Sequence, residues 1–201
     1  MSIRNQIVVA LASFSVLTLM CGSSIPTASE AHSTRPNGWL LGSWSHRIPI
    51  TVNPDSIEGS GLLRDFPVLL KLGPEQGTVF TRANANGSDL MVTKSDGWTT
   101  LGHEVVSFNP VTKQAEIWFR ADSLSKTQKV FYLYYGNPAQ TWFPTPGLAW
   151  NSNYLAAYHF SENPGQGVLK DWGSHANHAH SAVRRANWTS SDVASGQIGQ
   201  A

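Results

Sequence analysis

The sequence is short of cysteine and of charge. Its 201 residues include one cysteine, so no intrachain disulfide can form and packing must stabilise the fold. Lys and Arg number 14 and Asp and Glu 13, which gives a formal net charge of +1. That balance argues against a polybasic nucleic-acid-binding protein. Charged residues make up only 13% of the chain while 8 residues are Trp, a composition unlike that of disordered chains.

Several catalytic motifs are also absent. The His103-Glu104 pair lacks the second histidine that a zinc protease needs, because Ser107 stands four residues on. No Glu-x-Asp-x-Glu run supplies the carboxylates of a concanavalin A-like glucanase. Glu104 and Glu116 fall on separate predicted strands, and we favour surface carboxylates over a catalytic pair. The nucleophile-elbow and phosphate-binding loop patterns are missing. We therefore expect no catalytic residues and no enzyme activity.

One apolar run stands near the N-terminus, and no second run of that length follows it. Ile7 to Met20 comes after Arg4 and is too short to span a bilayer, which is typical of an export signal. The small-x-small stretch that ends at Ala31 suits signal peptidase, so we predict a signal peptide over residues 1–31. The mature chain is expected in the periplasm, on the outer surface or outside the cell, with no transmembrane helix.

Cys21 follows the apolar run directly, which is also a feature of bacterial lipoproteins. Met20 precedes it, where such signals have a small residue. We favour loss of Cys21 with the signal peptide, and a lipid anchor at Cys21 is the alternative.

Short apolar or alternating segments between turn signals predict an all-β chain, an antiparallel β-sandwich over residues 44–138 after an N-terminal linker at 32–43. The segments 115–120 and 129–135 carry large apolar residues on both faces and should be central strands, with Trp118 in the core. Pro67, at the start of its expected strand, costs no ladder bond if that strand lies at an edge. We expect a hairpin across Ser95–Gly97 and no helix. The expected strands are 46–52, 66–72, 89–93, 101–107, 115–120 and 129–135.

Five motifs in residues 40–138 together resemble the bacterial domain of unknown function 2341 family. They are Trp44-Ser45-His46-Arg47-Ile48-Pro49-Ile50, Asp65-Phe66-Pro67-Val68-Leu69-Leu70, Asn86-Gly87-Ser88-Asp89-Leu90, His103-Glu104-Val105 and Tyr132-Leu133-Tyr134-Tyr135-Gly136-Asn137. The resemblance implies an exported β-rich module of large surface proteins, sometimes found beside proton-channel components of the MotA/TolQ/ExbB type. The family offers no established catalytic residue to carry over.

The segment after the predicted linker at 139–153 resembles the opening of a concanavalin A-like (laminin-G-like) sandwich. The resemblance rests on the stretches 154–162, 170–174 and 196–201, and we predict a strand over 155–160. Residues 154–201 are too few for a whole domain of that kind, so we expect an incomplete second sandwich, from a truncated gene or a fragment.

Four tryptophans in predicted turns or linkers are candidates for ligand contact, since sugar rings stack on exposed aromatic faces. A role in the apolar core is the alternative for any Trp. The candidates are Trp39, Trp98, Trp142 and Trp172.

Two groups of residues suggest metal sites. Oxygen ligands around a turn, Asn86, Ser88, Asp89 and Asp96, suit calcium, although turn chemistry explains them without an ion. His175, His178 and His180 suit a transition metal, with Asp171 or His159 completing the site. We favour a solvated loop for the histidines and expect no cofactor.

Together these patterns favour an exported, non-catalytic binding module of the bacterial cell envelope that recognises carbohydrate or another envelope component. One alternative is an accessory or structural component of an energised, MotA/TolQ/ExbB-type envelope transport system. Another is a fragment of a larger hydrolase whose active site lies in missing strands. Nucleic acid is not an expected partner.

Overall fold

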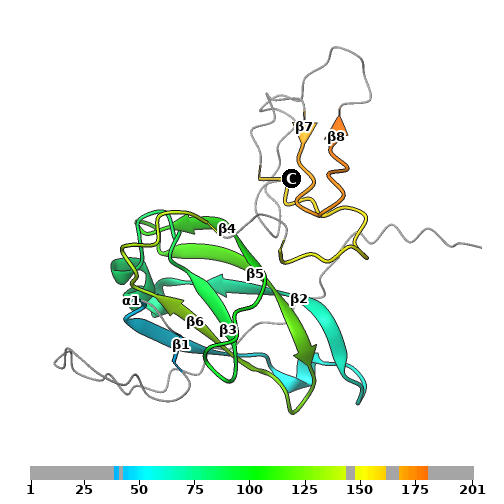
Figure 1. The fold of residues 1–201 in the computed structure, drawn as a ribbon, viewed down its shortest axis with the longest axis horizontal. Helices are drawn as coiled ribbons and strands as arrows, with labels where there is room; N and C mark the ends of the chain where they lie inside the picture. The colour runs from blue at the N-terminus through cyan, green and yellow to red at the C-terminus, as the bar shows by residue number, and fades with distance from the viewer. Residues whose placement is uncertain (1–38, 41–42, 144–147, 162–167, 181–201) are drawn as a thin grey trace, which may run out of the picture. The chain divides into compact units, whose positions relative to one another are not determined.

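A computed structural model of the chain describes residues 39–40, 43–143, 148–161 and 168–180 (Figure 1). The chain divides into two compact units, with a boundary between Ala149 and Trp150. The predictions on the signal peptide, its cleavage after Ala31 and Cys21 fall outside the described residues, as does the stretch 196–201. Within the described residues, no helix has the length and apolar character needed to cross a membrane.

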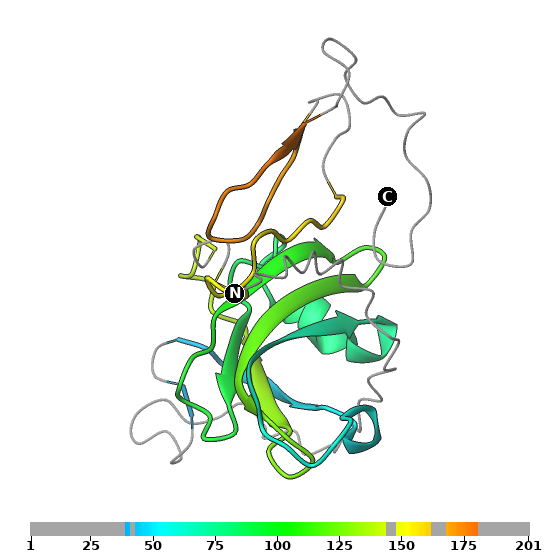
Figure 2. The same ribbon diagram turned by 90° about the vertical axis from the view of Figure 1, so that its right-hand side faces the viewer.

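Two antiparallel sheets make up the first unit. One has the order β1-β6-β3, and the other β2-β5-β4. Figure 2 shows the two sheets as facing layers, so the prediction of an all-β antiparallel sandwich is confirmed. The strands are β1 (His46–Thr51), β2 (Leu63–Leu72), β3 (Met91–Lys94), β4 (His103–Asn109), β5 (Gln114–Leu124) and β6 (Val130–Tyr135).

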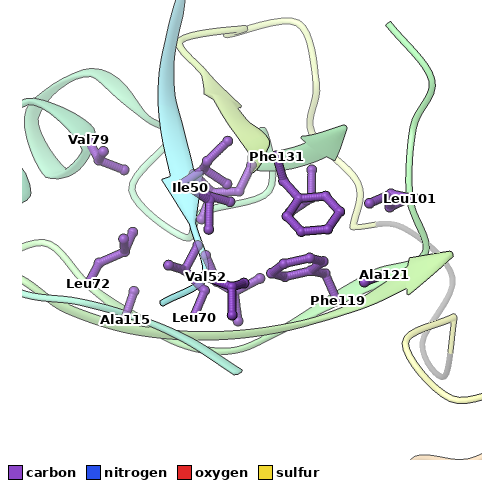
Figure 3. Close-up of a cluster of buried hydrophobic side chains, with 14 of the residues drawn as sticks. Ile50, Val52, Leu70, Leu72, Val79, Leu101, Ala115, Phe119, Ala121 and Phe131 are labelled. Atoms are coloured by element: carbon purple, nitrogen blue, oxygen red, sulfur yellow. The ribbon is translucent and has the colours of Figure 1, made fainter. Parts of the chain in front are cut away.

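The core fills the space between the two sheets (Figure 3). Alternation in β1 turns Ile50 inward at 0% exposure, and β2 does the same with Leu70 at 1%. The ring of Phe119 in β5 meets that of Phe131 in β6, with centroids 5.1 Å apart. Both β5 and β6 are central in their sheets, as predicted from their apolar residues on both faces. Each fully buried large apolar side chain contributes about 1.5–3 kcal/mol.

Trp118 is buried, but not in this core. It alternates along β5 with Ile117 and Phe119, which both point into the core, so its side chain lies on the opposite face of the sheet. The predicted burial of Trp118 is confirmed, and its side chain lies outside the cluster between the two sheets.

The predicted hairpin is only local. Gly97, with φ of 81°, donates to the carbonyl of Lys94 in a tight turn, and Thr93 bridges Thr100. Beyond that bridge the two strands separate, because β3 pairs with β6 and β4 pairs with β5. The chain thus passes from one sheet to the other, and the apolar pattern alone does not show this crossing.

The expectation of no helix was wrong. A helix α1 (Gly77–Arg82) follows the 3-10 turn η2 (Pro74–Gln76), and a further 3-10 turn η1 (Pro54–Ser56) follows β1. Six residues are too few for a helical period to show in the sequence, and so short a helix is held by packing. Its Val79 and Phe80 are buried in the core.

Two edge strands carry a proline. Pro67 lies inside β2 rather than at its start, and Pro49 lies inside β1. Each of these strands has one neighbour in its sheet, so both prolines lie on edge strands, where a proline is tolerated. A proline has no amide hydrogen to donate to a further strand at the open edge.

The second unit contains a short ladder of β7 (Val168–Leu169) with β8 (Ala179–His180). The strand predicted over residues 155–160 is not formed. The amide of Ala157 instead donates to Oδ1 of Asp171 at 2.8 Å, and the carbonyl of Ala157 accepts from the amide of Trp172. The Asp171 carboxylate therefore accepts the hydrogen bond that the Ala157 amide would donate to a neighbouring strand in a sheet.

Candidate functional site

Arg47 and three aromatic rings form a cluster on the outer face of sheet β1-β6-β3. The guanidinium carbon of Arg47 lies 4.6 Å from the ring centre of Trp39, 4.2 Å from that of Tyr132 and 5.7 Å from that of Tyr134. Arg47 alternates with the core residue Ile50 along β1, and the two tyrosines alternate with core residues of β6. Cation–π contacts of this kind stabilise by about 0.5–2 kcal/mol.

The hydroxyl of Tyr134 ties this cluster together. It accepts hydrogen bonds from Nη1 of Arg47 at 2.8 Å and from the amide of Leu40 at 3.1 Å. It donates to the carbonyl of Gly97 at 2.8 Å. The ring of Trp39 meets that of Tyr134 edge-on at 5.4 Å. The cluster thereby joins residues 39–40, the central strand β6 and the turn after β3.

That turn holds Trp98 outward. Asp96 Oδ1 accepts from the amides of Trp98 and Thr99 at 3.0 and 2.9 Å, and its Oδ2 accepts from Thr99 Oγ1 at 2.5 Å. Burial disfavours the charged form of Asp96, but the Thr99 and Trp98 hydrogen bonds and the charge of Lys94 outweigh it and lower its pKa. Trp98 is 54% exposed. An exposed ring on a fixed backbone is suited to stacking on a flat apolar ligand face.

The other two candidate tryptophans lie elsewhere. Trp142 is 64% exposed and follows Gln140, whose side-chain amide donates to the Trp142 carbonyl at 2.9 Å. Trp172 belongs to the second unit, where Lys170 Nζ lies 3.7 Å from its ring centre. Of the four candidates, the structure therefore brings Trp39 and the turn that carries Trp98 together around Tyr134. The sequence analysis missed Arg47, Tyr132 and Tyr134 as site residues. The alternation that turns these three side chains outward was the available signal.

Asp89 is the centre of a buried network that the sequence did not predict. Its Oδ1 accepts from the amide of Asn84 at 2.8 Å, and its Oδ2 accepts from the amides of Gly136 and Asn137 at 2.7 and 2.9 Å. Its backbone carbonyl accepts from Trp44 Nε1 at 2.7 Å. Both carboxylate oxygens are thus turned to the protein backbone, while Asp96 caps a different turn. The carboxylates of Asp89 and Asp96 thus each have a structural role, and a calcium site at these residues stays a prediction.

His103 is also bound within the fold. Its Nδ1 lies 3.0 Å from the carbonyl of Leu101, and its Nε2 lies 2.9 Å from that of Leu90. Burial lowers its pKa, against the opposite effect of both carbonyls and of Glu104. The residue stands on a strand, which confirms that His103-Glu104 is not part of a helical zinc motif.

The two glutamates weighed as a catalytic pair lie on adjacent strands. Glu104 is buried on β4, opposite Trp118. Glu116 on β5 forms an ion pair with Lys71, with 3.0 Å between Nζ and Oε1.

In the second unit, Asp171 organises the histidine loop. Its carboxylate accepts from the amides of Ala157, Gly173 and Asn177 at 2.7–2.8 Å. Burial alone would raise the pKa of Asp171, but these three hydrogen bonds and nearby His178 lower it. The amide of Asp171 in turn donates to His178 Nδ1 at 3.0 Å.

The three loop histidines have separate surroundings. His175 Nε2 lies 2.8 Å from the Ser152 carbonyl, whereas His180 stands on β8. In the part of the chain that the structure describes, no three His, Cys, Asp or Glu side chains gather as a metal-binding group. A transition-metal site at His175, His178 and His180 stays a prediction.

Residues 86–146 match the model of a family described as a domain of unknown function (DUF2341). No curated protein and no solved structure matches the chain. The matched stretch begins at the Asn86-Gly87-Ser88-Asp89-Leu90 motif and includes β3 to β6. The resemblance to this family is confirmed over these residues, whereas the concanavalin A-like segment stays a prediction.

Proposed function

We propose that the sandwich is an exported, non-catalytic binding module of the bacterial envelope that recognises carbohydrate. The contact surface is the outer face of sheet β1-β6-β3, where Trp39 and Tyr132 flank Arg47 and the adjoining turn presents Trp98. The observation that carries the proposal is the exposure of Trp98, 54%, on a turn that Asp96 and Tyr134 fix from both sides.

The physical basis is stacking on a prearranged surface. The apolar faces of pyranose rings pack on aromatic side chains, and Trp presents the largest area. The turn beside Trp98 is already ordered by its hydrogen bonds, so binding costs little conformational entropy there.

A glycan array probed with the purified chain tests this function, followed by calorimetric titration of the best oligosaccharide. We expect Trp98→Ala to abolish binding and Trp142→Ala to preserve it, since Trp142 is exposed even more than Trp98 but lies outside the cluster. Both variants should keep the unfolding midpoint of the parent chain. The proposal fails if no glycan binds, or if Trp142→Ala loses binding and Trp98→Ala does not.

The export step of this proposal rests on the run from Ile7 to Met20 and the small residues that end at Ala31. Mass spectrometry of the chain recovered from a bacterial host should give His32 as the first residue. A chain that retains residues 1–31 would contradict export, and an acylated Cys21 would favour the lipid anchor.

The second unit is proposed as the opening of a concanavalin A-like sandwich. The resemblance of its stretches and its antiparallel β7-β8 ladder support this proposal. A solved structure of a longer natural chain that contains residues 154–201 tests it. Strands that follow β8 and pair into two facing sheets would support it, and a helical continuation would overturn it.

A further inference from the structure

A second polar cluster lies at the end of β1, away from the tryptophan turn in the sequence. The ring of His46 stacks on that of Tyr135, with centroids 5.3 Å apart and planes at 20°. The hydroxyl of Tyr135 lies 3.3 Å from Oγ1 of Thr78 on helix α1. Arg82 stands four residues after Thr78, so the two residues share one face of the helix. The hydroxyl of Thr78 thus contacts Tyr135, and Arg82 lies one helical turn further along the same face of α1.

The hydrogen bonds of Ser45 fix the proton on His46. Ser45 Oγ donates its one proton to the carbonyl of Gly136 at 2.9 Å. The contact of 2.7 Å between Ser45 Oγ and His46 Nδ1 must then be donated by the ring, from Nδ1–H. Nε2 therefore carries a lone pair in the neutral ring and a second N–H in the imidazolium.

Arg82 is the charged residue whose effect on His46 is resolved. Burial and the positive charge of Arg82 both lower the pKa of His46. Tyr135 faces the ring from β6 as an uncharged phenol, and Asp89 directs both carboxylate oxygens to backbone amides. The charge of Arg82 thus opposes protonation of His46, and an anion bound beside both residues would favour the imidazolium.

We propose that His46, Arg82 and Thr78 bind an oxyanion, a carboxylate or phosphate group, and that binding is accompanied by proton uptake on His46. The guanidinium supplies paired donors, the imidazolium supplies Nε2–H and Thr78 supplies its hydroxyl. Ser45 and Gly136 hold the ring orientation through the other nitrogen. This site uses none of the residues of the carbohydrate surface, so the two proposals are independent of each other.

NMR titration of His46 in the purified chain tests the site, with inorganic phosphate and acetate as probes and sodium chloride at matched ionic strength. We expect an oxyanion to raise the pKa of His46 by about one unit relative to chloride. The bound anion would offset the positive charge of Arg82, which lowers that pKa. A rise with phosphate alone assigns a phosphate ligand, and a rise with acetate alone assigns a carboxylate. A rise with both supports a general oxyanion site.

Two charge-matched variants complete the experiment. Arg82→Gln should abolish the oxyanion-dependent rise, whereas Arg64→Gln on the exposed face of β2 should leave it intact. The resonances of buried His103 report that each variant is folded. Equal pKa values in phosphate, acetate and chloride would overturn the proposal, as would a full rise in folded Arg82→Gln.

Discussion

Asp89 Oδ2 lies 2.7 Å from the amide nitrogen of Gly136, a residue 47 positions further along the chain. The two residues belong to different motifs, one in the turn before β3 and the other directly after β6. Trp44, from a third motif, donates to the backbone carbonyl of the same aspartate. His103, from a fourth motif, has its Nε2 2.9 Å from the carbonyl of Leu90, the residue that follows Asp89. Four of the five short motifs thus meet at one turn, which gives them a structural explanation that needs no ligand.

Replacing Asp89 by Asn should therefore destabilise the whole sandwich. The variant removes the charge that three backbone amides share and places an amide group against at least one of them. Hydrogen bonds to buried charged groups contribute about 1.5–3 kcal/mol each, so we expect a loss of at least about 2 kcal/mol in urea unfolding. Asp122→Asn, which breaks only the exposed ion pair with Lys94, should cost less than about 1 kcal/mol. Equal losses would contradict this role of Asp89.

His103 should make stability depend on pH. Its pKa in the fold is below the ordinary 6.5, so the unfolded chain binds the proton more readily. The stabilisation is complete above pH 6.5 and decreases as pH falls below that value toward the folded-state pKa. Urea midpoints between mildly acidic and neutral pH should therefore rise with pH, and His103→Gln should flatten the curve. An unchanged slope in His103→Gln would assign the dependence to other groups, with His46 acting in the same direction.

Gly102 is required by a close approach of the chain. A Cβ at this position would lie 2.2 Å from the backbone carbonyl oxygen of Leu148. Gly102→Ala should cost about 1–3 kcal/mol, as overpacking does, and should increase proteolysis near Leu148. Gly61→Ala is the matched control, because nothing lies within 4 Å of its added Cβ and its φ is ordinary. Equal stability of the two variants would show that the Leu148 segment moves away at no cost.

Arg47→Lys should weaken the aromatic cluster although it keeps the charge. An ammonium group lacks the flat face that stacks on Trp39 and Tyr132, and it donates with a different geometry to Tyr134. We expect a loss of about 1 kcal/mol and a changed tryptophan fluorescence spectrum. Arg64→Lys should change neither quantity. Identical spectra for Arg47→Lys and the parent chain would contradict the stacking role.

In the second unit, Asp171 should control the order of its loop. The pKa of Asp171 is below the ordinary 3.8, so its stabilisation is present above that value and is lost as pH falls further. Asp171→Asn should speed hydrogen exchange at the amides of Ala157, Gly173 and Asn177 near neutral pH. Protection unchanged from that of the parent chain would show that other contacts hold the loop.

The sequence predicted the strands of the sandwich better than their connections. Alternation in β1 and the apolar runs of β5 and β6 follow directly from which faces are buried. The change of sheet between β3 and β4 depends on which strand each one pairs with, and this is decided by contacts far along the chain. Helix α1 left no periodic signal, because its six residues are too few for a helical period to show. Packing of Val79 and Phe80 in the core holds it.

The candidate site was predicted only in part. Composition pointed to the tryptophans, but exposure separates Trp98 from the partly buried Trp39, and exposure is a tertiary property. Asp89 and Asp96 were grouped as ion ligands because their oxygens are chemically suited to calcium. In the fold those oxygens accept from backbone amides, and the sequence does not show which amides come near.

The pairing of His46 with Tyr135 makes the completion of sheet β1-β6-β3 depend on the last strand of the sandwich. In the described part of the chain, β1 has β6 as its neighbour, and β3 pairs with the same strand. A chain that ends after β5 contains every strand of sheet β2-β5-β4 but lacks the centre of the facing sheet. The inner face of sheet β2-β5-β4 would then stay open to water. Residues up to Tyr135 are therefore required before the two layers can close on each other.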